Sequence, residues 1–355
     1  MYKLRRVAPM AIALSVLVVV AGCSTSENRG GDGIGEKVAI TAVNQGGSFG
    51  DIFAEVVSRP FEKKFGVEVL HDSPSTLAKV QTMVDSGNVT WDVVTLGAGT
   101  SNVPELCEKY FTPLDKKLIP NLADIKSDLA APCGVAQTLY GMVMVYNTKM
   151  FKGNPPSGWK DFFDTKKFPG KRAVGNVPGF IDAPVAALLA DGVAPKDLYP
   201  LDWPRATAKL DTIKDDLVFY ESGGASEQIM GAGEVAMAIV FSNRGYVATS
   251  AGAPYEPVWN QTFLHVTNFL IPKGAPHPKE AAAYINFALD PDIQAVWVER
   301  NAQGATNSKV KVSEDAAIRK WTPTVYPNDT FAIDESYMAT NLEANTKKWL
   351  EWIHG

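Results

Sequence analysis

The chain has little cysteine, little histidine, no surplus of basic charge and no long apolar run after its first residues. Its 355 residues include 34 basic and 39 acidic side chains, for a net charge of −5. A protein that binds nucleic acid normally carries an excess of basic surface charge, so we expect no nucleic-acid partner. Past residue 23 no stretch reaches the about 18 apolar residues of a spanning helix, so we expect no such helix there.

The chain has only four histidines and three cysteines. The histidines lie far apart and none has metal-ligand spacing with a cysteine, so we predict neither a metal site nor a cofactor. Cys107 and Cys133 are the cysteines that follow Cys23, and an even pair in an exported protein indicates a disulfide. Two buried free thiols are the alternative.

The N-terminus has the pattern of an export signal. Basic residues within the first six positions precede an apolar run over residues 7–20, which is short for a permanent membrane anchor. Residues 19–23 read VVAGC, which resembles the lipobox of bacterial lipoproteins. We therefore predict a signal peptide over 1–22, cleavage before Cys23 and lipidation of that cysteine.

Residues 23–36 are rich in glycine and serine and have almost nothing to bury, which predicts a flexible tether after the lipid anchor. The anchor and tether would hold the folded body at the outer face of a membrane. We expect an extracytoplasmic, lipid-anchored protein.

Short β-branched runs alternate with helical patterns along the rest of the chain. The chain is also longer than a single hydrophobic core usually supports, which predicts more than one domain. We predict strands over residues 38–43, 67–70, 91–96, 141–146, 235–241 and 266–271. Helices are predicted over residues 51–64 with a kink at Pro60, after a cap at Ser75, and over 183–189, 280–289 and 293–300. This order predicts an α/β fold with parallel, doubly wound sheets.

Ligands of doubly wound sheets bind at the carboxyl ends of the strands. The loops to examine are therefore residues 44–50, 95–101, 176–182, 241–244 and 263–268. In the first two loops the candidates are Gly46, Gly47, Ser48, Phe49 and Gly97. Glycine N–H groups at a helix start can face a ligand, or the two adjacent glycines can serve a tight turn that needs positive φ.

A series of motifs in family order resembles the extracytoplasmic solute-binding proteins of ABC importers, and most of all their spermidine/putrescine-binding branch. The motifs extend over about residues 37–310 and read GG at 46–47, PFEKKFGV at 60–67, WDVV at 91–94, YG at 140–141, YNT at 146–148, GWKDF at 158–162, FPGK at 168–171, GEVAM at 233–237, AGAP at 251–254 and AAAYINF at 281–287.

The resemblance implies a two-lobed fold with a hinge, each lobe built on a doubly wound sheet. Lobe 1 would comprise residues 37–141 and about 267–308, and lobe 2 residues 142–266 and about 309–355. The resemblance also implies a monomer that traps a small solute by closing its lobes and then docks on a membrane permease. No enzymatic step is implied.

By the same resemblance, five positions match ligand contacts of the polyamine branch: Asp182, Phe241, His265, Thr267 and Gln303. Only Asp182 keeps a family carboxylate, because His265 and Thr267 stand where the family has a tryptophan and an aspartate. One carboxylate would leave most of the charge of a buried polyamine uncompensated. The match therefore argues against spermidine itself.

Arg244 follows the strand that ends at Phe241 and could bind a carboxylate or phosphate. Together with Asp182 it favours a zwitterionic amine, for example an amino acid derivative. The alternatives are a salt bridge for Arg244, a helix N-cap for Asp182 and a structural role for His265.

Two other functions compete with solute binding. Residues 46–50 match the G-x-S-x-G pattern of a nucleophile elbow, which would make Ser48 the nucleophile of a secreted hydrolase. A lipoprotein that binds a protein or cell-wall partner could share the anchor and the fold.

Overall fold

The structure is a computed structural model that describes residues 38–176 and 181–355. All of these residues belong to one unit, Lys37–Gly355. The predicted signal peptide, Cys23 and the tether lie outside the described residues. Among the helices that the structure describes, none combines the length and apolarity needed to cross a bilayer.

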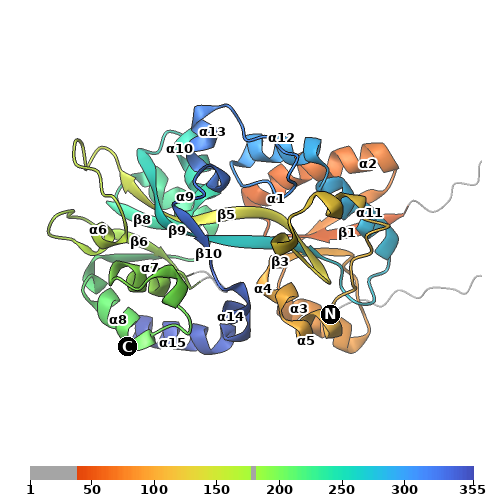
Figure 1. The fold of residues 1–355 in the computed structure, drawn as a ribbon, viewed down its shortest axis with the longest axis horizontal. Helices are drawn as coiled ribbons and strands as arrows, with labels where there is room; N and C mark the ends of the chain where they lie inside the picture. The colour runs from red at the N-terminus through yellow and green to blue at the C-terminus, as the bar shows by residue number, and fades with distance from the viewer. Residues whose placement is uncertain (1–37, 177–180) are drawn as a thin grey trace, which may run out of the picture. The chain divides into compact units, whose positions relative to one another are not determined.

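A single sheet runs through the described chain in the order β2-β1-β3-β9-β5-β8-β6-β7 (Figure 1). Two three-stranded parallel groups form its ends, and the antiparallel pair of β9 and β5 joins them. The first group comprises β1 (Ala39–Val43), β2 (Glu68–Asp72) and β3 (Val93–Gly97). The second comprises β6 (Arg172–Gly175), β7 (Leu217–Tyr220) and β8 (Met237–Phe241). The predicted parallel strands are confirmed in the first group, whereas in the second only β8 was predicted and β6 and β7 were missed.

The two central strands are longer than predicted and antiparallel. β5 spans Gly134–Asn147 and β9 spans Tyr255–Leu270, whereas the apolar pattern indicated only residues 141–146 and 266–271. Buried polar side chains interrupt the apolar pattern in the missed parts, among them Thr138 and His265. Two short strands flank this pair, β4 (Ala130–Ala131) beside β5 and β10 (Thr330–Ala332) beside β9.

The first predicted helix is three pieces. α1 (Gly47–Phe53) begins before the predicted start, a π-helical turn covers Ala54–Ser58, and α2 (Arg59–Phe65) follows. The irregular turn runs directly into α2 and precedes Pro60, which has no backbone N–H to donate to the preceding turn.

Thr76, and not Ser75, caps α3 (Leu77–Ser86). The Thr76 side chain accepts a hydrogen bond from the backbone N–H of Lys79 at 3.3 Å. The Ser75 hydroxyl instead donates to the carbonyl of Thr95 at 2.6 Å and so ties this loop to β3.

The remaining helices cover the two faces of the sheet. They are α4 (Gly99–Asn102), α5 (Pro104–Tyr110), α6 (Trp159–Phe163), α7 (Ala183–Ala190), α8 (Trp203–Asp211), α9 (Gly223–Ala232), α10 (Ser242–Ser250), α11 (Pro278–Ala288), α12 (Pro291–Asn301), α13 (Ala316–Trp321), α14 (Glu335–Thr340) and α15 (Leu342–His354). The predicted helices 183–189, 280–289 and 293–300 are confirmed to within about two residues, the usual uncertainty of a helix end.

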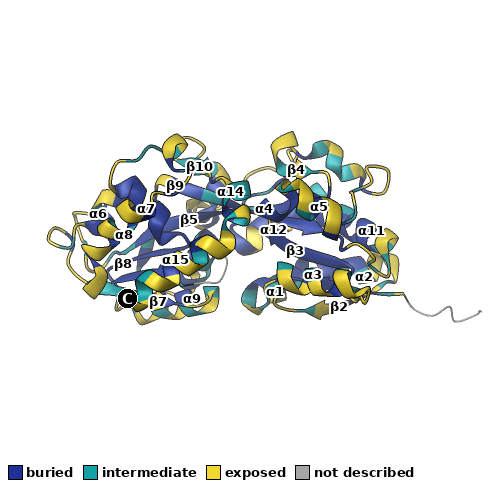
Figure 2. Cartoon of the chain, turned by 90° about the horizontal axis from the view of Figure 1, so that it is seen from below, coloured by how far each residue is buried: buried dark blue, intermediate teal, exposed yellow. Residues whose placement is uncertain are grey.

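Two large apolar cores pack against different parts of the sheet. One takes its buried side chains from residues 40–135 and 269–297, the other from residues 142–263 and 333–349. Every residue of α7 is buried in the second core, which fits its sequence APVAALLA. In Figure 2 the strands carry the buried colour while the outer helix faces are exposed.

Cys107 in α5 and Cys133, which precedes β5, are joined in the structure, with their Cα atoms 5.8 Å apart. Both residues are buried. This Cα separation lies within the ordinary range for a disulfide.

Arg172, the first residue of β6, is a fully buried cation that bonds only backbone carbonyls among its described partners. Its Nε donates to the carbonyl of Phe162 at 2.9 Å and its Nη1 to that of Gly170 at 2.5 Å. Its Nη2 donates to the carbonyls of Phe168 and Asp164. The guanidinium thus holds the segment from α6 to β6 in place, and burial lowers its pKa below the ordinary arginine value.

Replacing Arg172 by leucine should lower the free energy of unfolding by about 3 kcal/mol or more, because several buried carbonyls would lose their donors. Urea denaturation followed by tryptophan fluorescence measures the change. Arg205→Leu is the control, since Arg205 forms an exposed pair with Asp191 at 2.6 Å and should contribute less than about 1 kcal/mol. Equal losses in the two variants would contradict this role of Arg172.

Candidate functional site

The carboxyl ends of strands from both parallel groups converge on the middle of β5 and β9. β3 ends at Gly97, opposite Thr267, which in turn pairs with Thr138 of β5. β8 ends at Phe241, opposite Met142 of the same strand. Thr138 and Met142 are four residues apart in β5, which corresponds to about 13 Å along the strand. Sheets of this kind bind ligands at the carboxyl ends of their strands, which here meet this part of β5 and β9.

His265 lies in this interval and is held between two carboxylates. Its Nε2 is 3.0 Å from Oδ1 of Asp182, which precedes α7, and its Nδ1 is 3.5 Å from Oε1 of Glu335, the first residue of α14. His265 is only 4% exposed. Burial by itself would lower the pKa of His265, but the charges and hydrogen bonds of Asp182 and Glu335 outweigh it and raise this pKa to about 10. The ring is therefore a buried imidazolium at neutral pH.

Glu335 also binds the backbone of β9. Its Oε1 accepts a hydrogen bond from the N–H of Val266 at 3.1 Å. On this edge of β9, the pairing with β3 reaches Thr267 and the pairing with β10 reaches Leu264. The Glu335 carboxylate fills the gap between the two neighbouring strands and accepts from the N–H of Val266, whose carbonyl accepts from the N–H of Ala98 at 2.9 Å.

Aromatic rings enclose the imidazolium. The Tyr140 ring stacks on His265 with centroids 5.7 Å apart, and Phe241 meets Tyr140 edge-on at 5.5 Å. Burial and the negative charge of Glu335 raise the pKa of Tyr140 well above its usual range, although a hydrogen bond with Thr267 opposes this shift. Tyr140 therefore stays a neutral hydroxyl and contacts three predicted site residues: Phe241, His265 and Thr267.

The charges at this site do not cancel. One imidazolium stands between two carboxylates, which leaves a surplus of one negative charge among the three buried or nearly buried side chains Asp182, His265 and Glu335. A charge in a site of low water content is costly unless a partner compensates it. Across residues 38–176 and 181–355, no group of three histidine, cysteine or carboxylate side chains is arranged to hold a metal ion.

Ser48 and Arg244 meet at a second polar contact. The Nη1 of Arg244 donates to Oε1 of Glu227 at 2.8 Å and to the hydroxyl of Ser48. These three residues lie in α1, α9 and α10. A Cβ at Gly223 would lie 2.6 Å from the Nε of Arg244, so this glycine leaves space for the arginine stem. The guanidinium of Arg244 therefore connects Glu227 in α9 to Ser48 near the start of α1.

The other predicted residues of the first loop serve local structure. Gly46 and Gly47 have φ angles of 67° and 60°, which favour glycine, and the N–H of Gly46 donates to Oδ1 of Asn44 at 2.7 Å. Phe49 is buried and meets Trp297 edge-on at 5.2 Å, so its ring faces the core. A ligand contact for these three residues stays a prediction.

Gln303 and Gly97 lie at the border of the site. The buried Gln303 accepts hydrogen bonds at its Oε1 from the hydroxyl of Thr138 at 3.3 Å and from Asn301 at 2.9 Å. Thr138 pairs with Thr267 of β9, so Gln303 binds the direct strand partner of that predicted site residue. Gly97 is exposed, and a Cβ there would lie 3.9 Å from Oε2 of Glu335.

Residues 57–323 of the chain match the family of bacterial extracellular solute-binding proteins. The chain belongs to this family. The match covers most of the described body, including both central strands and Asp182, His265 and Arg244. The family resemblance predicted from the sequence is therefore confirmed, and this solute-binding protein is not an enzyme.

One relative by sequence and two solved structures match the chain over nearly their whole length. The sequence is 30% identical to the gamma-aminobutyric acid-binding protein of Pseudomonas aeruginosa over 88% of this chain and 90% of that protein. An ABC transporter substrate-binding protein from Bradyrhizobium japonicum is 32% identical, with a TM-score of 0.80 over 89% of this chain and all (100%) of that one. The A. tumefaciens protein AgtB, solved with agropinic acid, is 28% identical, with a TM-score of 0.78 over 90% and 100% of the two chains.

The comparisons place this solute-binding protein among the substrate-binding components of ABC importers, which work outside the cytoplasm. The hydrolase alternative is wrong on the geometry as well. In a triad with Ser48 as nucleophile, His265 would be the base, but both ring nitrogens of His265 face carboxylates, and the Ser48 hydroxyl instead contacts Arg244 and Glu227.

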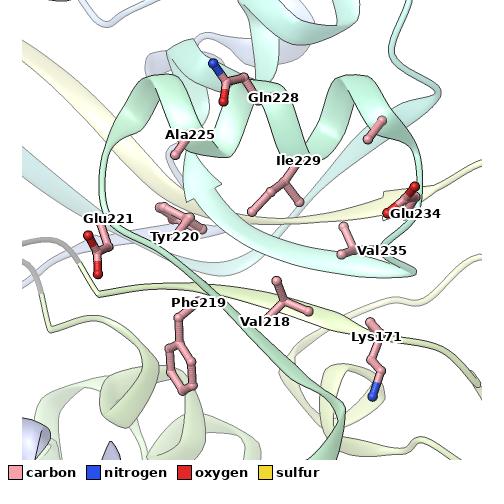
Figure 3. Close-up of a pocket in the computed structure, with 11 residues that line it drawn as sticks. Lys171, Val218, Phe219, Tyr220, Glu221, Ala225, Gln228, Ile229, Glu234 and Val235 are labelled. Atoms are coloured by element: carbon pink, nitrogen blue, oxygen red, sulfur yellow. The ribbon is translucent and has the colours of Figure 1, made fainter.

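Two surface grooves lie beside α9. Figure 3 shows the first, and Glu227, the partner of Arg244, lines the second. A groove of about 510 Å³ runs between β7 and α9, lined by apolar side chains such as Val218 and Ile229, with Glu221 and Glu234 at opposite ends. A second groove of about 390 Å³ separates α9 from the end of α10. None of the predicted site residues lines either groove.

Glu335 and Glu227 were not predicted from the sequence. Glu335 follows Asp334 at the start of a short helix near the C-terminus, where an acidic pair is common, so its local pattern carried no signal. Tyr140 was noted only as part of a family motif. Its place directly opposite His265 could have been inferred only from the strand pairing.

Replacing His265 by glutamine should remove a pH-dependent part of the stability. Because folding raises the pKa of His265 from 6.5 to about 10, its stabilising contribution is complete below pH 6.5 and is lost as the pH rises through 10. The difference in free energy of unfolding between wild type and variant should therefore shrink over this range. Urea denaturation at a series of pH values measures it. A constant difference would show that His265 is not an imidazolium.

Proposed function

We propose that this solute-binding protein captures a small zwitterionic amine, a molecule that carries one ammonium and one carboxylate, and delivers it to an ABC permease. The observation that carries the proposal is the surplus negative charge around His265. An ammonium group of the solute would compensate this charge, and the rings of Tyr140 and Phe241 would cover the adjoining carbon chain.

Arg244 is the group that we propose for the carboxylate of the solute. It follows Phe241 by three residues, and its side chain is 12% exposed. Its described hydrogen bonds to Glu227 and Ser48 both leave from Nη1. Because guanidinium groups bind carboxylates in a forked geometry, the other nitrogens of Arg244 suit this ligand.

The name of one relative supports this ligand class, because it is described as a gamma-aminobutyric acid-binding protein. Gamma-aminobutyrate has one ammonium and one carboxylate at the ends of a short alkyl chain. It is therefore a suitable first probe for this protein.

Capture would follow from the movement of two lobes. We propose that residues 37–141 with 267–308 form lobe 1, and that residues 142–266 with 309–355 form lobe 2. In support, the two largest apolar cores share no residue and draw mainly on these separate parts of the chain. Closure around a solute is the usual motion of such proteins, and the permease would dock on the closed form.

We propose three further features of the exported protein. Lipidation of Cys23 anchors a monomer to the outer face of a membrane, and residues 23–36 act as the tether. The Cys107–Cys133 pair is a disulfide, which an oxidising compartment would maintain. The short Cα separation of the pair supports this assignment.

Gamma-aminobutyrate should raise the melting temperature of the purified protein more than butyrate or n-butylamine at equal concentration, because only the zwitterion satisfies both charged groups. At 100 times its dissociation constant a ligand stabilises the folded state by about 2.7 kcal/mol. Differential scanning fluorimetry with a panel of amines and acids measures the shift.

Two results, one from this panel and one from separate measurements, would contradict the proposal. Stabilisation by spermidine or putrescine, and by no carboxylate, would assign the protein to the polyamine receptors. A stable protein partner in gel filtration, together with no solute in the mass spectrum of the denatured protein, would favour a lipoprotein that binds macromolecules.

Replacing Arg244 by glutamine should weaken the binding of a zwitterionic solute by about tenfold or more, equivalent to about 1.4 kcal/mol. Isothermal titration calorimetry with gamma-aminobutyrate measures the change. Arg300→Gln is the control, because Arg300 pairs with Glu55 at 2.6 Å on the exposed surface. A variant that melts earlier but binds with unchanged affinity would reduce Arg244 to a structural salt bridge.

A further inference from the structure

We propose that Glu335, carried by the C-terminal segment, is the carboxylate that receives the ammonium group of the solute, and that Gly97 keeps the approach to it open. This inference rests on the proposed function, since it requires a solute with an ammonium group. It assigns a binding role to a residue that neither its local sequence nor the polyamine resemblance indicated.

The two carboxylates around His265 are not equivalent. Asp182 has the shorter contact with the ring, at 3.0 Å, and its side chain is 8% exposed. Glu335 lies 3.5 Å from the ring, and its side chain is 15% exposed. Asp182 and the imidazolium therefore form the tighter and more deeply buried pair. The uncompensated negative charge lies mainly on Glu335, the carboxylate that a solute can reach.

One oxygen of Glu335 is already used, and the other points toward Gly97. The contacts with Val266 N–H and with His265 both involve Oε1. Oε2 lies 3.9 Å from the point that a Cβ at Gly97 would occupy, and Gly97 is exposed. A charge-assisted N–H···O bond requires about 2.8 Å, so an ammonium at Oε2 needs the space that a side chain at position 97 would restrict.

The backbone around Glu335 is held by a close contact with α4 and by a helix cap. Figure 1 shows α14 beside α4, and the contact is so close that a Cβ at Gly99 would lie 2.1 Å from the carbonyl oxygen of Glu335. Asp334 caps the helix by accepting a hydrogen bond from the N–H of Tyr337 at 2.8 Å. A carboxylate held in this way loses little freedom on binding, which favours affinity and selectivity.

The charge balance also defines the substrate class. One surplus carboxylate matches one ammonium, so the site should prefer a monoammonium solute to a diamine of similar length. The second ammonium of a diamine would require another acid, and the two acids near Glu335 are already used, because Asp182 pairs with His265 and Asp334 caps α14.

Glu335→Gln removes the charge and keeps the shape of the side chain. Titration calorimetry with gamma-aminobutyrate should show at least a tenfold loss of affinity, whereas Glu343→Gln, an exposed acid in the neighbouring helix α15, should bind within twofold of wild type. If the charge of Glu335 is not used by the solute, the two variants will bind equally well, and the inference is overturned.

Gly97→Ala provides a second test that leaves the charges unchanged. Its backbone is not in the left-handed region, so alanine is tolerated there, but the methyl group would narrow the approach to Oε2. We expect a several-fold loss of affinity for gamma-aminobutyrate at an unchanged melting temperature. The control is Gly231→Ala in α9, where a Cβ has no atom within 4 Å. Equal affinities of the two alanine variants would also overturn the inference.

The proposed function and the role of Glu335 would be contradicted by different results. If wild type binds gamma-aminobutyrate or another zwitterionic amine while Glu335→Gln and Gly97→Ala bind it as well, the proposed function stands and the role of Glu335 is wrong. If wild type binds only a solute without an ammonium group, both the ligand class and the role of Glu335 are wrong.

Discussion

The antiparallel pairing of β5 with β9 is the constraint on which the site depends. The two strands join the parallel groups, and their register fixes the positions at which β3 and β8 end. It also places His265 directly opposite Tyr140. Because side chains alternate between the faces of a sheet, a slip of one residue would turn His265 away from Asp182 and Glu335. Backbone hydrogen bonds, rather than loops, therefore set the geometry of the charged cluster.

Burying three ionisable groups in the middle of this sheet costs stability. A well-packed apolar cluster would often be at least as stable as a buried ion pair, so Asp182, His265 and Glu335 are weak candidates for a purely structural role. Their arrangement also leaves the cluster one charge short of neutrality. An uncompensated negative charge is expected where a cationic group of a ligand compensates it. The free energy that this charge costs the empty protein then contributes to the selectivity for such a ligand.

The parts of the fold that could be predicted are those whose signal is local. The three strands of the first parallel group, β8 of the second and helices such as α7 follow from short apolar runs and helical spacing, whereas the four-residue strands β6 and β7 were missed. β5 and β9 were only half recognised, because the polar residues that build the site, Thr138 and His265 among them, interrupt the apolar pattern. Glu335 was missed altogether, since it lies 69 residues from the backbone group that it binds and no local pattern reports a contact of that range.

The C-terminal segment connects the charge of the site to the packing of the whole body. Ile333 and Met338 belong to the core that contains α7, and the backbone of Glu335 between them touches Gly99 in α4. Beyond it, Trp349 of α15 donates to the side chain of Asn176 at 3.1 Å, close to the end of β6. A solute that neutralises Glu335 therefore acts on a residue whose helix contacts both parts of the sheet. Because a ligand stabilises the arrangement that binds it best, compensation of this one carboxylate would favour the conformation in which α14 rests on α4.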